Sequence, residues 1–151
     1  MLTADAEDLP GAGAGRGLYA LKHTPYFTSI GIYTGGEDLT AATVADPSYQ
    51  SDYVVLYRDQ IRDTLDHRTN RPLCDVAFIN DSLEPSRQNT EWYFHPKFTD
   101  KILVISITDI LPDVQLFIPY GADYWCQDKF PIAVLAAAIR CYNVDIHSSP
   151  Q

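Results

Sequence analysis

The segment Val76–Pro85 (VAFINDSLEP) decides the fold of this chain, because it joins an apolar run to a cluster of hydrogen-bonding side chains. A buried strand would continue apolar or alternate, whereas here the apolar run meets Asn80, Asp81 and Ser82, and the segment stops at a proline. This pattern is typical of a backbone that turns sharply while offering donors and acceptors. It predicts a functional site, although an ordinary Asx-type turn that closes a short helix fits the same residues.

Length and composition predict one globular domain. The chain has 151 residues, of which 46% are hydrophobic and 21% are charged, and these proportions are ordinary for a single domain with one core. The longest apolar run, 132–139, is too short to cross a bilayer, and the first residues lack the basic and apolar pattern of a secretory signal. We therefore expect an intracellular protein that does not bind membranes.

The net charge of the chain narrows the class of partner that it can bind. The chain has 20 acidic and 11 basic residues and a net charge of -9. This balance argues against direct nucleic-acid binding and either favours basic partners or simply keeps the chain soluble.

Cys74, Cys126 and Cys141 are odd in number and lack C-x-x-C spacing, and the histidines show no metal-binding spacing. We predict neither a disulfide framework nor a metal site.

The N-terminal residues 1–14 contain Pro10 and an alternating Gly-Ala run that can bury little side-chain area, which predicts a flexible arm. Gly15–Ala20 then matches the letters G-x-G-x-x-A of a dinucleotide-binding fingerprint. That motif needs a strand before it and a helix after it, and the sequence offers neither. The glycines instead predict a close approach of the backbone to another group.

The remaining pattern predicts a mainly β domain with one helix near its C-terminal end. Residues 58–71 are charged and aperiodic, which favours a loop or a solvated helix. Asp128 is the expected N-cap of a helix that runs through Arg140. The helix has one apolar face, formed by Phe130, Val134, Ala137, Ala138 and Cys141. Short strands are predicted by β-branched and aromatic runs over 18–21, 27–33, 53–57, 90–95, 101–108 and 114–118.

Four segments, taken in their order along the chain, resemble the SET domain. They are Gly15–Ala20 (GRGLYA), Ile30–Gly35 (IGIYTG), Phe78–Ser82 (FINDS) and Gln115–Trp125 (QLFIPYGADYW). In that family the corresponding blocks are Gly-x-Gly-Leu-x-Ala, Gly-Glu-Tyr-x-Gly-Glu, Arg-Phe-Ile-Asn-His-Ser-Cys and Glu-Glu-Leu-x-x-x-Tyr-Gly. Each block alone is weak evidence, and the resemblance rests on all four in the right order.

The resemblance implies a SET-domain β-clip of small curved sheets, with a pseudoknot-like C-terminal segment and a C-terminal helix. It places the SET domain at residues 15–127, after the arm 1–14. Residues 128–151 are then a helix and tail that pack on or beside the SET domain, in place of the family's cysteine-rich zinc element. The segment with Asn80 is expected to lie against the segment with Tyr120, so that the two motifs form one site.

The resemblance also implies a function, because SET domains transfer a methyl group from S-adenosylmethionine to a lysine side chain without a metal. The amine must first lose its proton, and an apolar channel lowers the pKa of a lysine from its reference value of about 10.4. The positions that match are Tyr120 for catalysis, Arg16, Gly17, Leu18, Asn80 and Asp81 for the cofactor, and Tyr33, Phe117, Ile118 and Tyr124 for the substrate channel.

Five positions depart from the family pattern. Asp81 stands where the family has histidine, Ala77 where it has arginine and Leu83 where it has cysteine. Ile32 and Gly36 replace two glutamates of the second block. These departures leave two hypotheses of function open.

The first hypothesis is an S-adenosylmethionine-dependent protein-lysine N-methyltransferase. An acidic chain suits a basic, lysine-containing substrate such as a histone tail, and the family suggests a nuclear location. The second hypothesis is a catalytically inactive SET-like module that binds a partner peptide by adding it as a strand to an exposed sheet edge.

Overall fold

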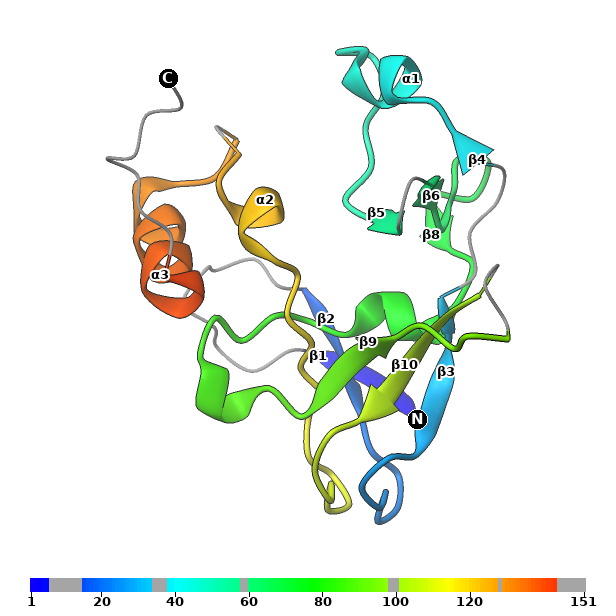
Figure 1. Cartoon of the computed structure of the whole chain (residues 1–151), viewed down its shortest axis with the longest axis vertical. Helices are drawn as coiled ribbons and strands as arrows, with labels where there is room; N and C mark the ends of the chain where they lie inside the picture. Colours follow the sequence, from blue (N-terminus) through cyan, green and yellow to red (C-terminus); the bar gives the residue numbers. More distant parts are fainter. Residues whose placement is uncertain (6–14, 34–37, 58–59, 98–100, 128, 144–151) are drawn as a thin grey trace. The chain divides into compact units, whose positions relative to one another are not determined.

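A computed structural model describes residues 1–5, 15–33, 38–57, 60–97, 101–127 and 129–143 (Figure 1). The chain divides into two compact units, which are described separately. Unit 1 is formed by residues 1–28, 78–91 and 106–151, and unit 2 by residues 29–77 and 92–105. In the described part of the chain, the strands form small antiparallel sheets and the helices are few, so the predicted mainly β fold is confirmed. Within these residues, no helix has the length and apolar character needed to cross a membrane.

In unit 1, β1 (Leu2–Asp5) pairs with β2 (Arg16–Tyr19) in a two-stranded antiparallel sheet. Residues 2–5 belong to the arm that the sequence predicted to be flexible, and the structure has them in a strand instead. Main-chain pairing with β2 needs no apolar side chains, so composition did not reveal it. Residues 6–14 lie outside the described residues. Gly15, directly before β2, has a left-handed φ of 67° that suits glycine.

The predicted strand over 114–118 is an extended segment that pairs on two sides. On one side the Leu116 N–H donates to the Leu18 carbonyl oxygen at 2.8 Å, and on the other the Ile118 N–H donates to the Asn80 carbonyl oxygen at 2.9 Å. The pairing consists of isolated bridges and not of a continuous ladder. This segment therefore joins β2 to the chain at Asn80.

The segment Val76–Pro85 contains the Asx-type turn that its sequence allows. The 3₁₀ helices η1 (Asp75–Phe78) and η2 (Pro85–Arg87) flank it. Between them, the Leu83 N–H donates to Asp81 Oδ1 at 2.8 Å, and Leu83 has a left-handed φ of 56°. Asn80, directly before the turn, still pairs through its main-chain carbonyl oxygen with Ile118. The turn therefore does not exclude a site at this position.

Two helices close unit 1 and stand together in Figure 1: α2 (Ala122–Trp125) and α3 (Ile132–Tyr142). The N-cap of α3 is Pro131 and not the predicted Asp128, which lies outside the described residues. Proline is suited to a helix start because its φ is fixed near the helical value and it lacks an N–H. The predicted apolar face is confirmed. Its cluster comprises buried Leu83, Val134, Ala137 and Ala138, packed against Trp125, Phe130, Cys141 and Tyr142.

One three-stranded sheet, most of whose residues belong to unit 2, has the strand order β3-β10-β9. Its strands are β3 (Ser29–Tyr33), β10 (Ile102–Ser106) and β9 (Thr90–Tyr93), all three close to predicted strands. Gly31 in β3 packs so closely that an added Cβ would lie 2.8 Å from Val76 Cγ1. The second sequence block therefore needs glycine at residue 31 for packing.

The rest of unit 2 corrects the prediction for residues 58–71, which was a loop or a solvated helix. Those residues include β6, which pairs on both sides in the order β4-β6-β5, and β7, which pairs with β8. These polar segments form strands because they pair with neighbouring strands, and not because their own sequences have a hydrophobic periodicity. The elements are β4 (Asp38–Leu39), α1 (Ala41–Ala45), β5 (Val54–Tyr57), β6 (Gln60–Asp63), β7 (Leu65–Asp66) and β8 (Arg71–Pro72).

Candidate active site

Hydrogen bonds join three of the four sequence blocks within unit 1. The Asn80 side chain donates from Nδ2 to the Arg16 carbonyl oxygen at 2.9 Å. The Tyr120 hydroxyl donates to the Ile79 carbonyl oxygen at 2.6 Å, and the Tyr120 N–H donates to Asp81 Oδ2 at 3.0 Å. The expected meeting of the Asn80 segment with the Tyr120 segment is therefore present in the structure.

The residues expected to bind a cofactor lie along this junction. Arg16 is exposed, whereas Gly17 and Leu18 are buried in β2. Asn80 is half-buried, and within the described residues its Oδ1 accepts no hydrogen bond. The same holds for the main-chain N–H and C=O of Asp81, which form no hydrogen bond inside the described part of the chain. The junction thus contains two acceptors and one donor that form no hydrogen bond within the described residues.

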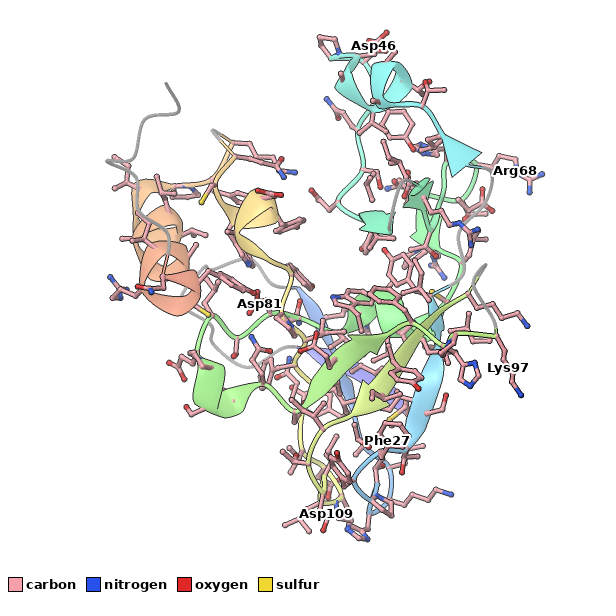
Figure 2. The ribbon with its side chains drawn as sticks, in the orientation of Figure 1. Phe27, Asp46, Arg68, Asp81, Lys97 and Asp109 are labelled. Carbon is pink, nitrogen blue, oxygen red and sulfur yellow. The ribbon has the colours of Figure 1, made fainter. Side chains whose placement is uncertain are left out.

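The carboxylate of Asp81 faces the protein. The residue is only 3% exposed, and both of its carboxylate oxygens accept hydrogen bonds from protein groups. Figure 2 labels Asp81 beside the helices that end unit 1. The sequence predicted Asp81 as a cofactor-binding residue. Its carboxylate is bonded to protein groups, and only its main-chain N–H and C=O have no hydrogen-bond partner within the described residues.

Aromatic rings surround Tyr120. The Trp125 ring stacks on the Tyr120 ring with centroids 5.7 Å apart and planes 11° apart, and the Tyr124 ring meets it edge-on at 4.8 Å. Lys129 Nζ lies 5.8 Å from the Tyr124 centroid and 5.2 Å from that of Phe130. These distances lie within the range in which an aromatic face attracts a cation, so the Lys129 ammonium group interacts with the faces of these two rings.

The residues predicted for the substrate channel differ in their burial and in the unit to which they belong. Phe117 and Ile118 are buried, at 3% and 1% exposure, and Tyr124 is half-buried in the aromatic cluster of unit 1. Tyr33 belongs to unit 2, where its hydroxyl donates to the Tyr53 carbonyl oxygen at 2.5 Å. Three of the four therefore lie in unit 1 and Tyr33 lies in unit 2, and a channel lined by them stays a prediction.

Comparison with known proteins identifies the family. A family model described as the SET domain matches residues 15–121, which is well over half of the chain. The chain belongs to the SET-domain family. Among solved structures, it is similar to the SET domain of the RIZ1 tumour suppressor (PRDM2), with 20% sequence identity, a TM-score of 0.47, and coverage of 85% of this chain and 71% of that chain. No curated protein matches.

Two residues beyond the matched range form hydrogen bonds to Asp81 within it. Trp125 donates from Nε1 to Asp81 Oδ2 at 2.8 Å, and the Tyr142 hydroxyl donates to the same oxygen. Both lie after residue 121, where the family match ends. Sequence reasoning missed Tyr142 as a site residue because no spacing rule links positions 61 residues apart. Burial and the hydrogen bond to Asp81 raise the pKa of Tyr142 above its ordinary value of 10.0.

In the residues whose placement is given, no three His, Cys, Asp or Glu side chains are grouped closely enough to hold a metal ion. The site consists of main-chain groups, one amide, one buried carboxylate and a set of aromatic rings. These groups can bind, orient and desolvate a ligand.

Proposed function

We propose that this SET domain is an S-adenosylmethionine-dependent protein-lysine N-methyltransferase with Tyr120 as a catalytic residue. The observation that carries the proposal is the junction of three blocks, in which Tyr120 bonds to Ile79, and the adjacent Asn80 bonds to Arg16. The SET family includes lysine methyltransferases and some binding modules. A retained junction favours the first of these.

The donor set of the junction fits the cofactor. S-adenosylmethionine carries amino groups, which need acceptors, and ring nitrogens and a carboxylate, which need donors. Asn80 Oδ1 and the Asp81 carbonyl oxygen supply acceptors, and the Asp81 N–H supplies a donor. When bound, the cofactor supplies an electrophilic methyl group on a sulfonium.

The residues around Tyr120 prepare the substrate amine. The ring neighbours of Tyr120 are Tyr124 and Trp125, and the buried Phe117 and Ile118 precede it in the same segment, so its surroundings have low polarity. Desolvation there disfavours an ammonium ion and lowers the pKa of the entering lysine below its reference value of about 10.4. The Tyr120 hydroxyl donates to the Ile79 carbonyl oxygen, which orients it, and a phenolic oxygen can accept a hydrogen bond from the amine and align it for attack.

The proposed substrate is a basic, lysine-containing segment of a protein, such as a histone tail. The net charge of -9 favours encounter with a basic chain. The same charge disfavours a direct nucleic-acid ligand. A histone substrate would place the protein in the nucleus.

The proposal is tested by incubating the protein with S-adenosylmethionine that carries a labelled methyl group, core histones and a library of lysine-containing peptides. A matched library has every lysine replaced by arginine. We expect label in lysine peptides or histones and none in the arginine library. If the protein binds the cofactor but labels no lysine substrate, the methyltransferase proposal is wrong and the peptide-binding module takes its place.

A further inference from the structure

The carboxylate of Asp81 is a hub for hydrogen bonds inside unit 1. Asp81 is 3% exposed, and five protein groups donate to it. The Oδ1 atom accepts from the Leu83 N–H at 2.8 Å and from Gln88 Nε2 at 2.6 Å. The Oδ2 atom accepts from the Tyr120 N–H at 3.0 Å, from Trp125 Nε1 at 2.8 Å and from the Tyr142 hydroxyl.

These donors take the place of a counter-ion. Within the described residues, no Lys, Arg or His side chain forms an ion pair with Asp81. A carboxylate can be buried only when other groups replace its lost hydration. Hydrogen bonds to an ionised acceptor are stronger than those between neutral groups. The five hydrogen bonds therefore fix the position of the carboxylate and, in turn, the positions of the five donor groups.

The two oxygens serve different parts of the molecule. Oδ1 bonds to Leu83 and Gln88, which lie 2 and 7 residues along the chain, and so stabilises the local turn. Oδ2 bonds to three groups that lie 39, 44 and 61 residues away. The turn alone needs only one acceptor, which an asparagine could supply. The second oxygen is what joins the turn to the distant groups.

The groups that meet at Oδ2 include Tyr120 and the residue that stacks on its ring. One is the main-chain N–H of Tyr120 itself. Another is the indole of Trp125, whose ring stacks on the Tyr120 ring. The third is the hydroxyl of Tyr142 at the end of α3. Because a displacement of about 1 Å in a reacting group can cost about 10²-fold in rate, the placement of Oδ2 bears directly on the chemistry.

We propose that Asp81 is a positioning residue, which sets Tyr120 through Oδ2 and, through Tyr142, makes α3 a working part of the active site. This inference rests on the proposed function and adds to it a role for a helix outside the family match. Histidine, which stands at this position in the family blocks, could not accept all of these hydrogen bonds. The aspartate at residue 81 therefore provides the acceptor to which Tyr142 of α3 donates.

The coupling is tested without reference to activity by nuclear magnetic resonance of the full chain labelled with ¹⁵N. Tyr142→Phe removes one donor to Oδ2, and Arg140→Ala changes an exposed residue of the same helix. We expect the Trp125 indole and Tyr120 amide resonances to shift in Tyr142→Phe and to stay in place in Arg140→Ala. Shifts confined to α3 in Tyr142→Phe would overturn the coupling.

The consequence for catalysis is tested with Asp81→Asn, Tyr142→Phe and the double variant, at a temperature where each is shown to be folded. We expect turnover to fall by roughly tenfold in each single variant, with the affinity for S-adenosylmethionine changed less than about twofold. The double variant is expected to be no slower than the slower single variant, because both act through one atom. Unchanged turnover in folded Tyr142→Phe, or effects that multiply, would overturn the proposal.

The two proposals fail in different ways. A wild-type protein that transfers no methyl group would remove the proposed function, and the resonance shifts would then decide by themselves whether Asp81 links Tyr120 to α3. An active wild type with an unaffected Tyr142→Phe variant would remove only the positioning role.

Discussion

The Tyr120 hydroxyl is the single group on which the proposed chemistry depends most. It donates to the Ile79 carbonyl oxygen at 2.6 Å, and its ring is fixed by stacking on Trp125. Phenylalanine keeps the ring and its stacking but removes the hydroxyl. The substitution therefore separates a chemical role for Tyr120 from a packing role.

For Tyr120→Phe we expect turnover to fall by about 10²-fold, the size of effect seen when one positioned hydrogen-bonding group is lost from an active site. The affinity for S-adenosylmethionine should change less than about twofold, because Asn80 and Arg16 stay in place. Steady-state kinetics and calorimetry measure the two quantities. The control is Tyr26→Phe, which loses a hydroxyl from a residue that is 64% exposed. Equal turnover in the two variants would contradict a catalytic role.

Tyr49 in unit 2 predicts a dependence of stability on pH. Burial, together with its hydrogen bond to Asp63, raises the pKa of Tyr49 from 10.0 to about 12. Between these values the unfolded chain loses the tyrosine proton while the folded chain keeps it, so the free energy of unfolding falls as the pH rises. In urea unfolding across this interval, Tyr49→Phe should lose less stability than the wild type. Parallel losses in both proteins would show that Tyr49 does not contribute.

At the scale of elements, α3 provides a matched pair of substitutions. Val134 is 2% exposed in the cluster with Leu83, whereas Ile132 on the same helix is 85% exposed. Val134→Ala should lower the free energy of unfolding by about 2 kcal/mol, because it removes buried methyl groups and leaves a cavity. Ile132→Ala should change it by less than about 0.5 kcal/mol. Chemical denaturation measures both, and similar losses would mean that α3 does not pack as described.

Strand β3 predicts a clash that a second substitution relieves. A Cβ at residue 31 would lie 2.8 Å from Val76 Cγ1, too close for any real contact. Gly31→Ala should therefore destabilise the protein by about 1–3 kcal/mol. In the Val76→Ala background the same change should cost much less, because the obstructing methyl is gone. A cost that is the same in both backgrounds would contradict this packing.

An element could be predicted from the sequence when its own residues determine its structure, and could not when distant residues determine it. Strand β10 (Ile102–Ser106) was predictable because its own residues are β-branched and apolar. Strand β6 (Gln60–Asp63) was not, because it is polar and is defined by partners on both sides. The Asn80 and Tyr120 blocks were predictable as one site from the family resemblance. The Asp81 hub was not, because its Oδ2 donors are 39 to 61 residues away in sequence.

At the scale of the whole molecule, the family match and the working site do not end at the same residue. The SET match covers residues 15–121, whereas the donors that share Asp81 Oδ2 with the Tyr120 N–H include Trp125 and Tyr142. The family therefore supplies the junction of Asn80 with Tyr120, and this chain supplies its own C-terminal support. The net charge of -9 adds a preference for basic partners.

Calorimetric titration of the full chain with S-adenosylmethionine tests most directly whether the junction is a cofactor site. We predict saturable binding to the wild type that weakens by at least about tenfold in Asn80→Ala, the loss expected when one well-placed hydrogen-bonding side chain is removed. Ile132→Ala, with its exposed side chain on α3, should bind as the wild type does. Folded wild-type protein that shows no binding, or binding that Asn80→Ala leaves unchanged, would contradict the assignment of the site.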